Sequence, residues 1–379
     1  MKSDLFELPS EIINNILLRL SVRSIAVSKC VCKPLLHLLG THDFAKSHFS
    51  KSAPALAFTM RTNDSYRLKI SELEEDEIDP ESHDLLTNIN FFPEAMVNFT
   101  AEASLGGSVN GLLFLFDYRN SCHYVSNPIT REFFFIRCPR VMVVSHGFGV
   151  SRITGQHKLV CIDPFGDGRF NCYVYTLGTG SWRRVEANDS FGWTPKIVAT
   201  FLNGNLHWMV WSDPYPMEQI FCFDLETECF SRFNVPPLRR SIMSRLLFTL
   251  RDCLCFCDDD EGDGTGRVVI WMMKEYGVEK SWTKEYVVTP NLAFLGHGLD
   301  KFPFQLLQPI KVFKNGDVLM LCGRKMFMYH SKHTKTTREI DGFFGQGEGF
   351  YYLNSLLLTP SLLPLKSFAG MENENVISF

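Results

Sequence analysis

The chain has 379 residues, of which 45% are hydrophobic and 21% are charged. This is the composition of an average globular protein, and it excludes disordered, collagen-like and coiled-coil proteins. The 38 basic residues are outnumbered by 42 acidic ones, and the resulting formal net charge of −4 argues against a nucleic-acid-binding protein.

The start of the chain and its apolar runs indicate an intracellular protein. Residues 1–7 lack the basic stretch and apolar core of a secretion signal. No run approaches the roughly 18 apolar residues that a membrane span requires. The 12 cysteines are scattered, which predicts reduced thiols rather than a disulfide framework. We therefore expect a location in the cytoplasm and/or nucleus, with no membrane partner.

Residues 1–46 are predicted to form a separate helical domain. Pro9 and Glu11 suit a first helical turn, where a missing N–H costs nothing and an acidic side chain favours the helix dipole. The helix would carry a wide apolar stripe. The stripe consists of Ile12, Ile13, Ile16, Leu17 and Leu20.

Two further short helices are expected before residue 46. Ser21 or Ser24 can cap the second, and the apolar segment at residues 30–39 forms a third that ends at Gly40. Three short helices cannot bury this much apolar surface among themselves. Part of it is therefore expected to face a partner or the next domain.

These residues resemble a known family. The segment Leu8-Pro9-x-Glu11-Ile12-x3-Ile16-Leu17-x-Arg19-Leu20, followed by Cys30-Val31-Cys32-Lys33 and then Leu38 and Phe44, is similar to an F-box. The resemblance implies that the domain binds a Skp-type adaptor and, through it, the cullin and RING subunits of a ubiquitin ligase. The adaptor contacts that it implies are Leu8, Pro9, Ile12, Ile16, Leu17, Leu20, Val31 and Leu35.

Two positions depart from the family pattern. Ser21 stands where the family usually has proline, and Leu35, after Pro34, stands where it usually has tryptophan. Proline is poorly tolerated inside a helix, so the third helix should begin or kink near Pro34. A missing tryptophan removes an anchor of the kind that dominates interfaces. A helical cap packed on the next domain is the alternative to an adaptor-binding head.

From residue 105 the pattern changes to short strands between turns. Asn-Gly pairs at 110–111, 203–204 and 315–316 separate apolar runs, which is a strong hairpin signal. Weaker equivalents occur at Gly155 and at Arg251-Asp252. Each first turn is followed by a second, as in YVSNPITREFFFI and FCFDLETECFSRF. Two hairpins make four strands.

A repeated unit of two hairpins, and therefore of four strands, predicts a kelch-like β-propeller. Five blades can be counted, and strands at 55–60, 66–70 and 351–358 could pair the two ends of the chain as a sixth. The expected fold is α+β and multi-domain, with a helical F-box at 1–46 and a connecting segment at 47–104. The connecting segment is followed by a propeller of about six blades at 105–365 and by a tail at 366–379.

The β region also resembles a known domain. GSVNGLLFL, NPITRE, GFGVSRITGQHKLV, VYTLGTGSWR, NGNLHW, FDLETECF and WMMKEYGVEKSWTKEY occur in this order, as in the F-box associated domain of plant F-box proteins. In that family the domain recruits the substrate and has no known catalytic centre. The resemblance therefore implies a protein that presents an unknown protein target to a ligase.

The cysteine and acidic clusters give no convincing metal site. Cys253, Cys255 and Cys257 alternate along a strand, where neighbours on one face lie about 7 Å apart, too far to share a tetrahedral ion easily. The acidic run at 258–264 would place Ile270 where a calcium loop needs a bidentate Glu. We expect buried thiols and a solvated loop, and likewise an exposed acidic loop at 72–84. We predict no metal and no cofactor.

Catalytic patterns are also missing from the sequence. There is no Walker A loop, H-E-x-x-H or G-x-S-x-G, and the 11 histidines, His207 and His330 among them, are dispersed. We therefore expect no intrinsic chemistry. Most of Trp182, Trp208, Trp211, Trp271 and Trp282, which lie in or beside strand patterns, are expected in the blade cores.

Loops at one end of a propeller usually carry its ligand contacts. On that ground the candidate target-binding residues are Asp213, Tyr215, Arg239, Arg240 and Asp259. The predicted function is the substrate-recognition subunit of a Skp–cullin–F-box ubiquitin ligase, acting by proximity. The alternatives are an interaction protein with a degenerate F-box, and a propeller enzyme with a site at the central channel.

Overall fold

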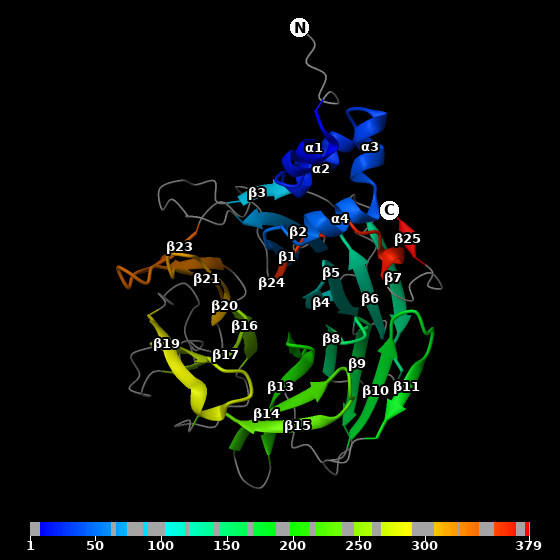
Figure 1. Cartoon of the computed structure of the whole chain (residues 1–379). Helices are drawn as coiled ribbons and strands as arrows, with labels where there is room; N and C mark the ends of the chain where they lie inside the picture. The colour runs from blue at the N-terminus through cyan, green and yellow to red at the C-terminus, as the bar shows by residue number, and fades with distance from the viewer. Residues whose placement is uncertain are drawn as a thin grey trace.

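The computed structural model describes residues 8–61, 66–73, 86–89, 103–117, 121–139, 145–164, 170–186, 198–212, 217–236, 246–259, 267–289, 307–323, 326–340, 352–368 and 376–378. A helical head is followed by a ring of β-sheets (Figure 1). Among the helices of the described residues, none combines the length and the apolar character that a membrane span needs.

The head contains four short helices, one more than the sequence predicts. They are α1 (Ser10–Leu17), α2 (Val22–Lys29), α3 (Lys33–Leu39) and α4 (His42–Phe49). The fourth begins at its N-cap Thr41, whose hydroxyl oxygen accepts a hydrogen bond from the backbone N–H of Phe44 at 3.3 Å. Its polar surface hides its periodicity, because only Phe44, Ala45 and His48 are buried.

The described strands form six antiparallel sheets, which are the blades of the propeller. The first blade contains β24 (Tyr352–Leu358), β1 (Ala55–Arg61), β2 (Tyr66–Leu73) and β3 (Leu86–Ile89). The second contains β4 (Ala103–Val109), β5 (Leu112–Asp117), β6 (Cys122–Asn127), β7 (Glu132–Arg137) and, at its edge, β25 (Ile377–Ser378). The third contains β8 (Ser145–Val150), β9 (His157–Pro164), β10 (Phe170–Thr176) and β11 (Trp182–Val185).

The other three blades repeat this four-stranded plan. The fourth contains β12 (Thr200–Leu202), β13 (Asn205–Ser212), β14 (Met217–Asp224) and β15 (Phe230–Asn234). The fifth contains β16 (Leu247–Leu250), β17 (Cys253–Asp259), β18 (Val268–Met273) and β19 (Trp282–Val288). The sixth contains β20 (Leu307–Val312), β21 (Val318–Cys322), β22 (Met326–His330) and β23 (Thr337–Glu339). The described residues also include two 3-10 turns, η3 (Glu279–Ser281) and η6 (Leu365–Ser367).

The two ends of the chain close the ring, as the sequence predicts. β24 pairs with β1 in a register that runs from Ala55 opposite Leu358 to Arg61 opposite Tyr352. β24 contacts β4 on one side and β20 on the other. The propeller therefore begins at Ala55 and not at residue 105, and β25 in the expected tail adds a fifth strand to the second blade. Six blades account for the repeat.

The predicted hairpin turns are present. Asn110-Gly111, Asn203-Gly204 and Arg251-Asp252 have positive φ at both central residues, the geometry that matches strand twist in two-residue hairpins. Gly155 and Gly316 also have positive φ. The sequence signals at these turns are local, because the required backbone conformation selects Asn, Asp or Gly.

Apolar clusters fill each of the six spaces between neighbouring blades. Alternate residues of one strand serve opposite neighbours: in β1, Ala55 and Ala57 face the second blade, whereas Leu56 and Phe58 face the sixth. In β17, Cys255 and Cys257 face the sixth blade together, as predicted from their spacing. Because side chains alternate across a strand, each blade is apolar on both faces and is stable only between two others.

The ring has two different ends. In the second to sixth blades, short turns join the first strand to the second and the third to the fourth, all at one end, which we call the short-turn end. Here the β4–β5 turn at Gly111 lies against Ser361, just beyond β24. Antiparallel strands alternate in direction, so the remaining connections of each blade start and finish at the opposite end.

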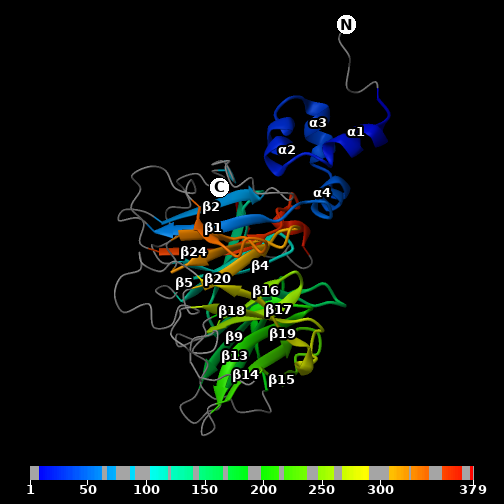
Figure 2. The same cartoon turned by 90° about the vertical axis from the view of Figure 1, so that its left-hand side faces the viewer.

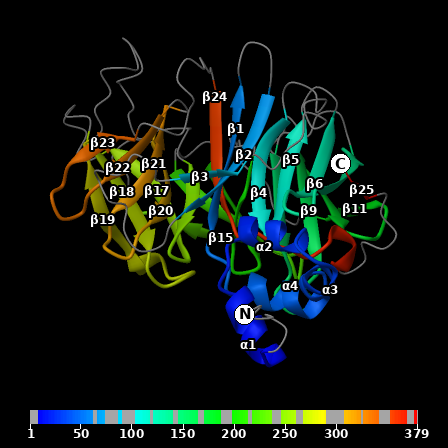
Figure 3. The same cartoon turned by 90° about the horizontal axis from the view of Figure 1, so that it is seen from above.

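The head lies at the short-turn end. It precedes Ala55, whose partner Leu358 ends β24. Figure 2 and Figure 3 show the helices beside the start of β1, away from the tip of that strand. Leu362 joins the head's apolar cluster, and Ile129, in the β6–β7 turn, packs against that cluster. The apolar cluster of the head thus extends into the propeller and packs the head against the ring.

Candidate functional site

Helix α1 is apolar over a wide stripe, and only half of that stripe is covered. Ile13 and Leu17 are buried in the head's own apolar cluster. Ile12 and Ile16, one residue earlier on the helix, are each 46% exposed. Residues four apart lie on the same helix face, so these two isoleucines form an open apolar strip. The sequence predicts such surplus apolar surface, and this part of it is confirmed.

More exposed apolar side chains lie elsewhere in the head. In the described residues, six of the eleven large hydrophobic side chains that are exposed lie between residues 8 and 36. They are Leu8, Ile12, Ile16, Val27, Val31 and Leu36. Scattered exposed apolar residues are ordinary, whereas a concentration of them in one small domain indicates an interaction surface.

The structure divides the predicted adaptor contacts into two groups. Leu8, Pro9, Ile12, Ile16 and Val31 are exposed, and Leu20 is half-buried. Leu17 and Leu35 are buried at 5% and 6% exposure within the head, so in the free chain their side chains hold the helices together and present no surface. Val27 and Leu36, which the prediction omits, are exposed instead. Periodicity identifies an apolar stripe but not which half of it the neighbouring helices cover.

The residues that depart from the family pattern are well accommodated. Ser21 is the N-cap of α2, and its hydroxyl oxygen accepts a hydrogen bond from the backbone N–H of Ser24 at 3.2 Å. Pro34 occupies the first turn of α3, where its missing N–H breaks no helical bond. Leu35 fills part of the head's core. The departures therefore leave the fold of the head intact.

Polar contacts tie the second blade to the chain beneath the head. The side-chain amide of Asn127 donates to the carbonyl oxygens of Ser361 and Leu363 at 3.1 and 2.7 Å. Its carbonyl oxygen accepts the backbone N–H of Ile129 at 3.0 Å. Glu132 accepts the backbone N–H of Leu365. These bonds fix the segment that contacts the head, so the head's orientation is built into the fold.

Four of the predicted target-binding residues fall outside the described part of the chain. These are Asp213, Tyr215, Arg239 and Arg240; Asp259 is the last residue of β17, and its side chain lies outside the description as well. The strands that flank them are described. β13, β15 and β17 all end at the end of the ring opposite the head, because each follows a short turn at the head's end. Strand topology thus places the strand ends that precede the three predicted segments at one end of the ring, which the sequence alone leaves open.

The cysteines and acidic residues that the sequence suggested as metal ligands do not form a metal site in the described residues. Cys255 and Cys257 are buried among the apolar residues between the fifth and sixth blades, and burial raises the pKa of both thiols. Of the acidic run, Asp258 is buried, and residues 260–266 lie outside the described part. The acidic segment at 74–84 lies outside it too.

His207 and Cys222 lie next to each other but are not arranged as a base and an activated thiol nucleophile. His207 Nε2 lies 2.8 Å from the Tyr276 hydroxyl and 3.6 Å from Cys222 Sγ. Burial raises the pKa of Cys222, although hydrogen bonds partly oppose it, and burial lowers the pKa of His207 to about 4. A protonated thiol is a poor nucleophile. This group is best described as a buried hydrogen-bonded set.

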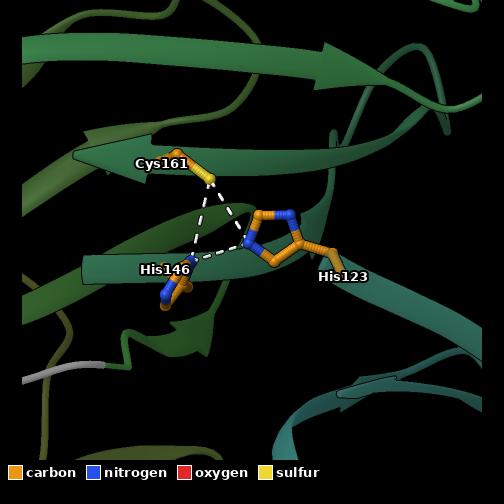
Figure 4. Close-up of side chains that lie close together, drawn as sticks. All are labelled: His123, His146 and Cys161. Atoms are coloured by element: carbon orange, nitrogen blue, oxygen red, sulfur yellow. Dashed lines mark hydrogen bonds between the residues drawn. The ribbon is translucent and has the colours of Figure 1, made fainter. Parts of the chain in front are cut away.

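A second histidine–cysteine cluster was not predicted from the sequence. His123, His146 and Cys161 come from β6, β8 and β9, and their ligand atoms all lie within 4.8 Å of one another (Figure 4). They are the set of three His, Cys, Asp or Glu residues in the described chain that could hold a metal ion. Their sequence spacing contains no recognised metal pattern, because the contact arises only when the second and third blades pack together.

The chain resembles characterised sequence families over most of its length. Residues 39–364 match the family described as "F-box associated beta propeller domain", and residues 5–47 match the "F-box domain". It is 26% identical to "F-box protein CPR1" of Arabidopsis thaliana, over 74% of this chain and 73% of that protein. It is 28% identical to "F-box protein At3g07870" of the same plant, over 83% of this chain and 80% of that protein.

A solved structure titled "Structure of YjhT" covers 76% of this chain and 97% of its own, at 10% identity and a TM-score of 0.39. That likeness is too weak to bear on function. The two family matches carry the assignment, since the first covers the six four-stranded blades and the second covers most of the helical head, in the same order along the chain. The chain therefore belongs to the family of F-box proteins whose larger part is an F-box associated β-propeller domain.

Proposed function

We propose that the protein is the substrate-recognition subunit of a Skp–cullin–F-box ubiquitin ligase. The head binds a Skp-type adaptor, which connects it to the cullin and RING subunits, and the propeller holds a protein target. The protein carries out no bond chemistry of its own. It raises the effective concentration of the target near the ligase. The observation that carries the proposal is the half-covered α1 helix within a matched F-box.

The adaptor surface centres on the exposed strip of Ile12 and Ile16. Covering a fully exposed isoleucine stabilises a complex by about 1.5–3 kcal/mol, so two half-exposed ones contribute on the order of 2 kcal/mol together. Leu8 at the start of the strip extends it. Leu17 acts indirectly, because its buried side chain packs α1 against the rest of the head.

The target is expected at the end of the propeller opposite the head. The segments that contain the predicted target-binding residues Asp213, Tyr215, Arg239, Arg240 and Asp259 join strand ends on that side. Adaptor and target would then occupy separate surfaces and bind at the same time. This separation supports a bridging role, since one protein can be held while the other is engaged.

Binding of the purified full-length chain to a Skp-type adaptor tests the proposal. Ile16→Lys places a charge in the apolar strip, and we expect adaptor affinity to fall at least about 30-fold, since hot-spot losses reach 2 kcal/mol or more. Ile153→Lys is the matched control, because Ile153 is 84% exposed in the β8–β9 turn and lies outside the head. It should bind like the unmodified chain.

The competing function is that of an interaction protein that does not couple to a ligase. The residues that favour it are Ser21, Pro34 and Leu35, which replace the usual family residues. An unmodified chain that binds no Skp-type adaptor, yet is folded by circular dichroism, would establish this alternative. Equal loss of binding in Ile16→Lys and Ile153→Lys would also contradict the proposed docking surface.

The proposed location is the cytoplasm and/or nucleus. All twelve cysteines are free thiols in the structure, which suits a reducing compartment. Imaging of a tagged chain checks this point. Secretion of the tagged chain would contradict it.

A further inference from the structure

The cluster of His123, His146 and Cys161 lies in the space between the second and third blades. The exposed fractions of the three residues are 0%, 2% and 0%. Phe116 stacks on His146 with ring centres 5.0 Å apart, and Trp182 lies over His123 at 5.7 Å. Three potential metal ligands are thus enclosed by aromatic rings, a setting in which a bound metal would be shielded from water.

The separations between the ligand atoms resemble those around a tetrahedral zinc ion. Bonds of about 2.05 Å to nitrogen and 2.3 Å to sulfur place two nitrogens about 3.3 Å apart and a nitrogen and a sulfur about 3.6 Å apart. Cys161 Sγ lies 3.7 Å from both His123 Nε2 and His146 Nδ1 (Figure 4). The two nitrogens are 2.8 Å apart, so they must separate by roughly half an ångström to admit the ion.

A candidate for the fourth ligand lies at the rim of the cluster. Cys138, the residue after β7, places Sγ 3.5 Å from His123 Nε2 and 3.6 Å from His123 Nδ1, so its thiol lies beside this ring and has to turn toward the other three ligands to complete the set. It is half-buried, whereas the other three residues are buried, so it marks the side from which an ion would enter. Two thiolates and two neutral imidazoles around Zn²⁺ carry no net charge, which avoids the cost of a buried charge.

We propose that His123, His146, Cys161 and Cys138 bind a structural zinc ion that joins the second blade to the third. The ligands come from β6, the end of β7, β8 and β9, so one ion would connect two sheets that meet mainly through apolar side chains, with polar contacts from Trp182 to Arg137 and between Asn110 and His157. The set is closed with four protein ligands, which is the arrangement of structural rather than catalytic zinc.

The protonation states suit this role. Burial, with a smaller contribution from His146, holds the pKa of His123 well below its ordinary value, and burial lowers that of His146 to about 4. Both rings are therefore neutral at pH 7 and can offer a lone pair. Burial raises the pKa of Cys161, and it raises that of Cys138 to about 12, with smaller contributions from Cys122 and Asp117.

Metal binding must therefore remove the two thiol protons. Each thiol loses one proton to solvent as its sulfur bonds to zinc, and the ion's charge stabilises both thiolates. The proton shared between His123 Nε2 and His146 Nδ1 moves to another ring nitrogen, so the imidazoles release none. No oxidant or reductant takes part.

The alternative is an internal hydrogen bond between two neutral imidazoles. The chain offers a comparison: His207 and Cys222 are equally buried, and Cys222 Sγ lies 3.6 Å from His207 Nε2. In that pair, His207 Nε2 faces the hydroxyl of Tyr276, and His207 Nδ1 lies 3.0 Å from the carbonyl oxygen of Thr200. That set has one imidazole and a backbone partner, and it supplies a matched control for the zinc cluster.

The test is the metal content of the full-length chain purified without chelator and dialysed against metal-free buffer. We expect about one zinc ion per chain by elemental analysis. Replacement by Co²⁺ should give the sulfur-to-cobalt charge-transfer band and the visible bands of a tetrahedral site with nitrogen and sulfur ligands. The same protein exposed to Cu⁺ tests whether the site prefers that soft ion.

Two cysteine variants distinguish the cluster from general effects of folding. Cys161→Ala should lose the zinc, whereas Cys222→Ala removes an equally buried thiol and should keep it. Cys138→Ser, at the half-exposed rim, is least disruptive and should raise the zinc dissociation constant more than about 100-fold, because even the loss of a residue that only hydrogen-bonds to a ligand costs 10- to 100-fold in metal affinity.

A chain without zinc that also gives no cobalt spectrum would overturn the proposal. Equal metal loss in Cys161→Ala and Cys222→Ala would overturn the ligand assignment. Tight zinc binding by Cys138→Ser would overturn the assignment of Cys138 as the fourth ligand. Copper bound in preference to zinc at equal free concentration would overturn the identity of the ion. None of these results bears on adaptor binding, which depends on the head.

Discussion

The head and the propeller use their apolar residues in opposite ways. In the propeller, Phe58 and its neighbour Phe327 are wholly buried between the first and sixth blades. In the head, Ile12 and Ile16 lie beside a buried face of the same helix and are each 46% exposed. Neighbouring residues of helix α1 therefore differ in solvent exposure, whereas both faces of each blade are buried against neighbouring blades.

Size and closure explain this difference. Six blades arranged in a ring leave no blade face without a neighbour, because β24 pairs with β1 and the first blade contacts both the second and the sixth. Four helices of seven or eight residues have too little volume to cover their own apolar surface. A closed ring is complete by itself, and a small head gains stability from a partner.

Breaking the closure of the ring should have the largest effect on stability. Phe58→Ala leaves a cavity between the first and sixth blades, where the ring of Phe58 meets that of Phe327 at 5.7 Å. We expect it to lower the free energy of unfolding by about 3–5 kcal/mol, measured by denaturant titration. Phe135→Ala, at a position that is 49% exposed on β7, is the control and should cost under about 1 kcal/mol. Similar losses in both would contradict a ring held by its blade contacts.

Position 35 sharpens the comparison within the head. Leu35→Trp restores the usual family residue, but the side chain at this position is buried in the head's own core. We expect overpacking to lower the free energy of unfolding by about 1–3 kcal/mol. Thermal unfolding of the variant and the unmodified chain measures this. A stabilised variant with tighter adaptor binding would show that the tryptophan can reach a partner instead.

The smallest effect is expected from an ion pair that joins two blades. Glu228, in the β14–β15 turn, contacts Lys158 at 2.8 Å and Arg183, both on the third blade. Burial by itself raises the pKa of Glu228, but hydrogen bonds from Arg183 and Lys158, together with their charges, outweigh it and hold the pKa below the ordinary 4.5. Its contribution to stability is therefore complete above pH 4.5 and is lost as the pH falls through the lowered value.

Glu228→Gln should accordingly lower the unfolding midpoint at pH 7 and make the midpoint less sensitive to acid. Thermal unfolding of both proteins across pH 3 to 7 tests this. Parallel curves for the two proteins would contradict a role of this carboxylate in linking the third and fourth blades. The adaptor interaction should be unchanged at pH 7, since the ion pair lies outside the head.

Much of the fold could be predicted because its signals are local. Asn110-Gly111 and Asn203-Gly204 require positive φ at both turn residues, and few side chains tolerate it. Cys255 and Cys257 share a face because side chains alternate along any strand. The helix α4 was missed because its surface is mostly polar, so its periodicity is weak.

The candidate sites were predicted less completely. The apolar stripe of α1 was identified, but its division into the buried Leu17 and the exposed Ile16 was not, since the packing of the other helices decides it. The strand ends that precede the predicted target-binding segments share one end of the ring because of strand direction, which a series of turns in the sequence does not reveal.

The sequence by itself determined the elements of this protein: a capped helical head, paired hairpins, and blades apolar on both faces. Turn chemistry and side-chain period act over a few residues, so they can be read directly from neighbouring letters. Only the tertiary structure decided which apolar residues stay open and that His123, His146 and Cys161 meet. Those outcomes depend on contacts between blades and helices, and residues distant in the chain become neighbours only when the ring closes.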